Sequence, residues 1–123
     1  MADQEDVRRL ALALPETREE DDRFAFSVLV KSRWKLFVWA WNERVDPKKP
    51  RVPREDVVAV RVPDQQDKYA LIAQDGAIFF TEPHYENFPA VLVRLPEVGA
   101  DQLAELIVDA WRTQAPRELR DTR

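Results

Sequence analysis

The chain has 123 residues, of which 45% are hydrophobic and 34% are charged, and its formal net charge at pH 7 is −4. This length and balance are typical of one domain with its own core and exclude an intrinsically disordered chain. The absence of cysteine excludes disulfides, thiol catalysis and cysteine-ligated metal sites. Charges interrupt every apolar run and the N-terminus is acidic, so we expect neither a membrane span nor a secretory signal. We therefore expect a single cytoplasmic domain over residues 1–123, with a charged tail at residues 116–123.

The positive charge is concentrated in the middle of the chain. Residues 23–62 carry ten basic and four acidic side chains, whereas the segments on both sides are acidic. This block indicates an anion-facing surface on an otherwise acidic domain.

The first third of the chain predicts a helix and an edge element. Apolar residues recur at helical spacing over residues 3–14, with Asp3 in position to cap the helix and Pro15 to end it. The acidic segment 16–22 predicts a charged connector or a short edge strand.

Two β-rich runs at residues 24–30 and 34–41 predict an antiparallel hairpin with a turn at Lys31-Ser32-Arg33. Strict alternation in the second run would place Trp34, Leu36, Val38 and Ala40 on one face and Lys35, Phe37, Trp39 and Trp41 on the other. Core or interface packing is one interpretation of the aromatic face. The alternative is a stacking platform for bases or another planar ligand.

The segment 42–56 combines three prolines with five basic residues, which predicts a stiff, extended loop rather than a helix or a central strand. Its charges could contact DNA phosphates as a wing, or could serve only solubility. The nucleic-acid-binding residues predicted from this loop and the hairpin are Lys31, Arg33, Lys35, Lys48, Lys49, Arg51 and Arg54.

After a strand at residues 57–62, Asp64 is expected to cap a short helix that ends near Ala73. The predicted inward side chains of this helix are Tyr69, Ile72 and Ala73, and Gly76 is expected to end it in the left-handed conformation.

The second half of the chain is organised around two short strands, at residues 78–81 and 90–95, and the loop between them. This loop holds the only histidine, His84. A last helix is predicted at residues 101–114. Strands clustered between terminal helices predict an α+β sandwich, with helices packed on one face of a mostly antiparallel sheet.

Several motifs resemble the MmcQ/YjbR family over nearly the whole chain. The most specific is Phe79-Phe80-Thr81-Glu82-Pro83-His84-Tyr85, followed by Pro89-Ala90-Val91-Leu92-Val93-Arg94-Leu95. Val62-Pro63-Asp64 and Ala110-Trp111-Arg112 add to it. The resemblance implies a CyaY-like (frataxin-type) fold and DNA binding through a double-wing arrangement of hairpins. The chain departs from the family pattern at Glu86-Asn87-Phe88, where relatives usually have a glycine-containing turn.

We predict no catalytic residue, metal or cofactor, and therefore no enzyme. His84 would need a second group within hydrogen-bond reach for acid–base catalysis, and only loop neighbours are assured nearby. We interpret His84 as bonding backbone groups that hold its loop. Frataxin-like iron handling would need an acidic ridge on the first helix, where only Asp3, Glu5 and Asp6 occur.

Two functional hypotheses follow. The first is weak, largely sequence-independent DNA binding by the basic residues named above. The alternative is a non-enzymatic module for an unidentified protein or small ligand, in a monomer or weak dimer with no membrane contact. Its aromatic groove would be lined by Trp39, Trp41, His84, Tyr85 and Phe88, with Phe37 beside them.

Overall fold

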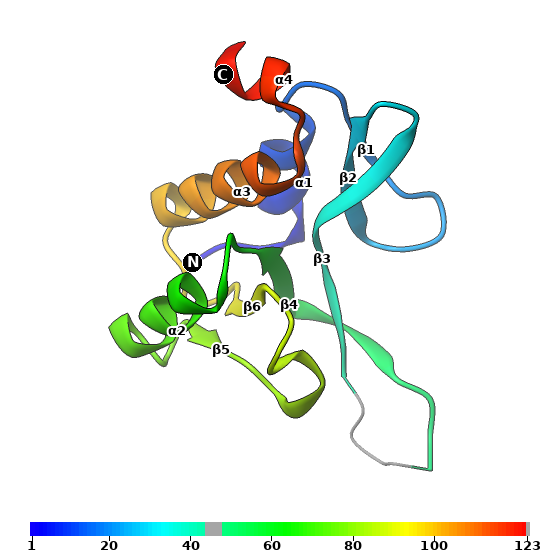
Figure 1. Ribbon diagram of the computed structural model, residues 1–123. Helices are drawn as coiled ribbons and strands as arrows, with labels where there is room; N and C mark the ends of the chain where they lie inside the picture. The colour runs from blue at the N-terminus through cyan, green and yellow to red at the C-terminus, as the bar shows by residue number, and fades with distance from the viewer. Residues whose placement is uncertain (44–47, 123) are drawn as a thin grey trace.

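The computed structural model describes residues 1–43 and 48–122, which form an antiparallel sheet with helices on one side (Figure 1). In chain order the elements are α1 (Gln4–Leu12), β1 (Thr17–Glu19), β2 (Ala25–Val30), β3 (Arg33–Glu43), β4 (Val52–Arg61), α2 (Gln65–Gln74), β5 (Phe79–Phe80), the 3-10 turn η1 (Pro83–Tyr85), β6 (Ala90–Arg94), α3 (Ala100–Gln114) and α4 (Arg117–Thr122). The predicted α+β class is confirmed.

The sheet has the strand order β1-β2-β3-β4-β6-β5, and every neighbouring pair is antiparallel. The two edge strands are short, with three residues in β1 and two in β5. For the acidic segment 16–22 the sequence left a charged connector and a short edge strand open, and the structure shows the edge strand β1.

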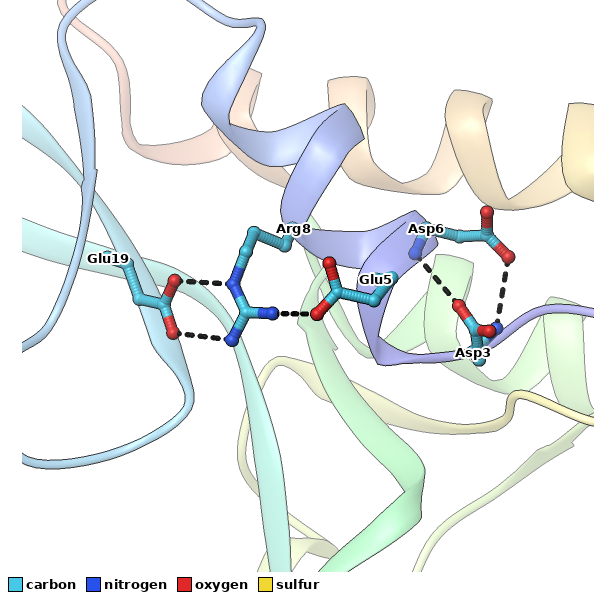
Figure 2. Close-up of polar contacts among 5 residues, drawn as sticks. All are labelled: Asp3, Glu5, Asp6, Arg8 and Glu19. Atoms are coloured by element: carbon cyan, nitrogen blue, oxygen red, sulfur yellow. Dashed lines mark hydrogen bonds and ion pairs between the residues drawn. The ribbon is translucent and has the colours of Figure 1, made fainter.

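The helix α1 is fixed at its start and along its length by carboxylates (Figure 2). The Asp3 side chain accepts a hydrogen bond of 3.0 Å from the backbone N–H of Asp6, and Asp6 returns one of 3.1 Å to Asp3. This reciprocal cap confirms the predicted role of Asp3, and the backbone N–H of Asp3 lowers the pKa of the Asp6 carboxyl. Arg8 binds both carboxylate oxygens of Glu19, at 2.7 and 3.0 Å, and also contacts Glu5. The edge strand β1 is therefore tied to α1.

The main core lies between the helices and one face of the sheet. Fully buried side chains of α1 and α3, among them Val7, Ile107 and Trp111, pack against sheet residues such as Val38 and Val60. Figure 1 shows α1 and α3 next to each other over this face. The prediction of helices on one face is confirmed.

A β-bulge in β3 breaks the predicted alternation. Phe26 pairs with Val38, but the next residue of β2, Ser27, pairs with Leu36, which leaves Phe37 as the extra residue. Phe37 and Val38 consequently both enter the core under the helices. Placing Phe37 on the same face as Trp39 and Trp41 was wrong, because a period of two assumes an unbroken ladder.

The β3–β4 hairpin is longer than predicted. β3 continues to Glu43 and β4 already begins at Val52, so much of the expected loop 42–56 is strand, while residues 44–47 lie outside the described residues. Pro53 is tolerated because this part of β4 pairs with β3 alone, and β6 joins only from Val57 onward.

Helix α2 is capped by Asp64, as predicted, but two other predictions for it were wrong. Tyr69 is 43% exposed, and the fully buried residue of α2 is Lys68. The left-handed stop at Gly76 is also wrong, because no glycine has a positive φ in the described chain and Asp75 caps the helix in an extended conformation.

The charged tail also differs from expectation. Residues Arg117–Thr122 of this tail form the short helix α4, for which no secondary structure was predicted from the sequence. Leu119 packs against the core, which gives α4 an apolar anchor.

Candidate binding site on the second face of the sheet

The face of the sheet opposite the helices carries a small apolar cluster of its own. Trp41, Val57, Ala59 and Leu92 are buried there. Trp39, Phe80 and Tyr85 pack against them and cover part of this second face. Core packing, one of the two interpretations of the aromatic face, therefore holds for Trp41, and aromatic side chains provide much of the cover of this second face.

Four aromatic rings converge beside this cluster and line a hollow of about 220 Å³, called here the aromatic hollow. They are Trp39 of β3, His84 and Tyr85 of η1, and Phe88. The Trp39 indole N–H donates a 3.1 Å hydrogen bond to the Tyr85 hydroxyl. The Phe88 ring meets Trp39 and Tyr85 edge to face, with centroid distances of 6.2 and 6.1 Å. These contacts hold the rings in a defined arrangement.

Lys68 of α2 fixes the loop that carries three of these rings. Its ammonium donates hydrogen bonds to the backbone carbonyls of Tyr85, Glu86 and Phe88, at 3.3 Å for Glu86 and 3.0 Å for Phe88. The side chain is fully buried, and this burial lowers the pKa of Lys68 against a smaller opposing effect of Glu86. The sequence offered no signal for this role, because Lys68 sits where a solvated lysine would also fit.

The expectation for His84 was wrong. The ring is exposed, and within the described part of the chain it makes no hydrogen bond, only a tilted contact with Tyr85 at a centroid distance of 6.2 Å. Lys68 performs the loop-holding role that the sequence suggested for His84.

Arg61 borders the aromatic hollow from β4. Its guanidinium lies 5.0 Å from the centroid of Phe88, a cation–π contact. The side chain is half-buried, and burial lowers the pKa of Arg61. A ligand in the hollow would therefore meet aromatic surface with a cation at its border.

Trp41 does not line the aromatic hollow. It is only 8% exposed and packs edge to face on Phe80 at 5.5 Å, within the buried cluster of the second face. Four of the five predicted groove residues are thus brought together, and the fifth belongs to the support beneath them.

The predicted basic residues fall into two groups at opposite ends of β3. Lys31, Arg33 and Lys35 lie at the β2–β3 turn and beyond it, where they are exposed, and Lys31 has a positive φ of 59°. Lys48, Lys49, Arg51 and Arg54 lie at the other end, toward the bottom of Figure 1. Because the 11 residues of β3 span roughly 35 Å, the groups do not form one patch.

The second group is partly neutralised. Arg54 donates two hydrogen bonds to Asp56, at 3.1 and 3.0 Å, and one of 2.6 Å to Glu43. Glu43 and then Asp56 raise the pKa of the Arg54 guanidinium. Arg51 donates to the backbone carbonyl of Asn42 at 2.9 Å. Arg54 in particular is occupied by its protein partners.

The described residues contain no group of three or more His, Cys, Asp or Glu side chains placed to hold a metal ion. None of their helices combines the length and apolarity that crossing a bilayer requires.

The six-stranded antiparallel sheet with helices on one face defines an α+β fold, and comparison with known proteins gives it a family. The family model YjbR matches residues 12–113, and the chain belongs to the YjbR family. The predicted family is therefore confirmed.

The chain is 37% identical over 129 residues to the uncharacterized protein Rv2570 of Mycobacterium tuberculosis (strain ATCC 25618 / H37Rv), covering 97% of this chain and 93% of the relative. The same values hold for the uncharacterized protein Mb2600 of Mycobacterium bovis. The fold is similar to the crystal structure of Deinococcus radiodurans protein DR2400, with its DUF419 domain. The TM-score is 0.69 at 19% identity, over 99% of this chain and 88% of that one.

Proposed function

We propose that this protein is a non-enzymatic binding module whose aromatic hollow takes up one planar ring of a small molecule. The observation that carries this proposal is the convergence of Trp39, His84, Tyr85 and Phe88, from two separate segments, on one hollow of about 220 Å³. An apolar cavity of about 150 Å³ accommodates benzene, so the size suits a single ring rather than a larger ligand.

The surroundings favour a hollow that exists before the ligand arrives. Trp39 and Tyr85 are joined by a hydrogen bond, and Lys68 holds the loop through the backbone carbonyls of Tyr85 and Phe88. A preformed site avoids the entropy of ordering side chains on binding. The exposed side chains of His84 and Phe88 leave the hollow accessible.

The test is a titration with uracil and with phenol, each a single planar ring, and the binding is monitored through the amide chemical shifts of the protein. We expect saturable shifts at Trp39 and residues 84–88 that Phe88→Ala abolishes. The control is Trp34→Ala, which removes another exposed ring of β3 outside the hollow and should leave the titration unchanged. Shifts absent in the wild type, or retained in Phe88→Ala, would refute the proposal.

A second candidate function is weak, largely sequence-independent DNA binding. The observation that favours it is the exposed group Lys31, Arg33 and Lys35, which forms no salt bridge with the described residues and leads along β3 toward Trp39. Phosphate contacts need only such accessible cations.

Fluorescence anisotropy of labelled single- and double-stranded DNA, at about 50 and 200 mM salt, tests this function. We expect binding that weakens steeply with salt and is lost in the Lys31, Arg33, Lys35→Ala variant. A Lys48, Lys49→Ala variant shows whether the far end of the hairpin contributes as well. No binding to the wild type at the lower salt concentration would exclude DNA as the partner.

A further inference from the structure

A second cavity, of about 720 Å³, lies on the helix side of the molecule, between α2, α3 and α4. Three arginines line it, namely Arg61 at the end of β4, Arg112 of α3 and Arg120 of α4. Asp67 and Asp109 line it as well. This volume lies within the range of small-molecule binding sites and is well above that of the aromatic hollow.

The charges around this cavity are not paired with one another. Among the described residues none of the three arginines or two aspartates forms a salt bridge, although both signs share one cavity. Paired charges would have satisfied each other. Two arginines and two aspartates therefore remain available to a bound molecule, while the third arginine, Arg61, also stacks on Phe88.

Arg61 adds a second, independent observation. Its Nε is buried and has no hydrogen-bond acceptor in the described chain, and the side chain is half-buried. The guanidinium stacks on Phe88, but this stacking leaves the Nε–H without an acceptor, so an anion that reaches it would recover free energy.

We propose that the cavity between α2, α3 and α4 binds a small organic phosphate that also carries hydroxyl or amino groups, the chemical class of nucleoside monophosphates. The planar guanidinium groups suit phosphate oxygens. Asp67 and Asp109 accept hydrogen bonds from the hydroxyl or amino groups. Leu71 and Leu106 supply apolar surface for the remaining part. This cavity shares Arg61 with the border of the aromatic hollow but has no other lining residue in common with it, and the proposal does not depend on the function proposed for the hollow.

The experiment is isothermal titration calorimetry of the full chain with adenosine monophosphate, adenosine and inorganic phosphate. We expect adenosine monophosphate to bind more tightly than either of the others, because only it satisfies both the arginines and the aspartates. Equal affinity for adenosine would show that the arginines do not recognise the ligand, and no binding of adenosine monophosphate would overturn the proposal directly.

The residue assignment is tested by Arg112→Gln and Arg120→Gln, both at exposed positions whose replacement should leave the fold intact. Each is expected to weaken adenosine monophosphate binding by about tenfold or more, the effect of losing one charge-assisted hydrogen bond. Arg117→Gln, an exposed arginine of α4 that does not line the cavity, is the matched control. Unchanged affinity in both Arg112→Gln and Arg120→Gln would contradict the assignment. Arg61 is left unaltered because it also contacts Phe88.

Discussion

Lys68 shows how a single buried charge can organise a loop. Its ammonium donates to three backbone carbonyls of one loop, those of Tyr85, Glu86 and Phe88, and it forms no salt bridge with a carboxylate within the described residues. A buried cation in such a place is tolerated only because its hydrogen bonds offset desolvation. The arrangement of the aromatic hollow therefore depends on a residue that does not line it.

We predict that Lys68→Met destabilises the protein by about 2 kcal/mol, because it leaves three loop carbonyls without their donor. Urea denaturation measures the change, and Lys31→Met, at an exposed turn position, is the control expected to stay within about 0.5 kcal/mol of the wild type. A Lys68→Met variant as stable as the wild type would show that the loop holds without this donor.

Lys68 also makes the stability of the folded state depend on pH in the alkaline range. Since burial lowers its pKa in the folded state, the unfolded chain binds this proton more tightly. Stability should therefore rise with pH between the lowered folded value and the unfolded value near 10.5. The stability difference between the wild type and Lys68→Met should change in favour of the wild type as the pH rises toward 10.5. A difference that does not vary with pH would show that the pKa of Lys68 is not lowered.

His84→Ala provides a contrast at the same loop. Because the ring is exposed and makes no hydrogen bond within the described chain, we predict a change in unfolding free energy within about 0.5 kcal/mol. The midpoint of thermal unfolding measures it. A substantial loss of stability would restore a structural role for His84.

At the scale of elements, α1 depends on its reciprocal cap. Asp3→Ala removes an N-cap and should cost about 1 kcal/mol of unfolding free energy, measured by urea denaturation.

The neighbouring Asp6 links this cap to pH, because its pKa is lowered in the folded state. Its contribution is present above the unfolded pKa of 3.8 and is lost as the pH falls through the lower folded value.

Asp6→Asn should remove this acid sensitivity. We expect the wild type to be more stable than Asp6→Asn at neutral pH and the two stabilities to converge in strong acid. Chemical denaturation at a series of pH values measures both stabilities. A constant difference over the whole range would mean that the carboxylate charge at Asp6 contributes nothing to the cap.

Elements were more predictable than their details. The caps at Asp3 and Asp64 and the existence of helix α3 could be predicted because they depend on neighbours a few residues away. The bulge at Phe37 could not be predicted. Its position depends on how β2 pairs with β3, and nothing in the composition of β3 marks it. The early start of β4 was missed for a related reason, because Pro53 is acceptable in a strand only where one side is unpaired.

At the scale of the whole molecule, Trp111 joins segments from the two ends of the chain. Its indole N–H donates a 3.1 Å hydrogen bond to the Pro15 carbonyl, and the side chain is fully buried. We predict that Trp111→Phe destabilises the protein by about 2 kcal/mol through the orphaned carbonyl and the lost volume. Trp34→Phe, at an exposed position, is the control in the same thermal unfolding assay. Equal effects of the two substitutions would argue against this account of Trp111.

The candidate sites were only partly visible in the sequence. Tyr85 and Phe88 share a loop, but their meeting with Trp39 depends on the crossing of β3 and the loop before β6, which no local pattern specifies. The basic block looked continuous along the chain, yet an 11-residue strand separates its two groups in space. The cavity between α2 and α4 combines residues far apart in sequence, so Arg112 and Arg120 carried no signal of their own.

The short strands β1 and β5 at the two edges of the sheet affect how this protein behaves in a crowded solution. An exposed strand edge recruits other chains through its unpaired N–H and C=O groups, and the longer the edge, the stronger this tendency. With three residues in β1 and two in β5, these edge strands offer little backbone for such pairing, and the open side of β4 before Val57 is interrupted by Pro53, which has no N–H to donate. Edge-to-edge association through β1 or β5 is therefore disfavoured.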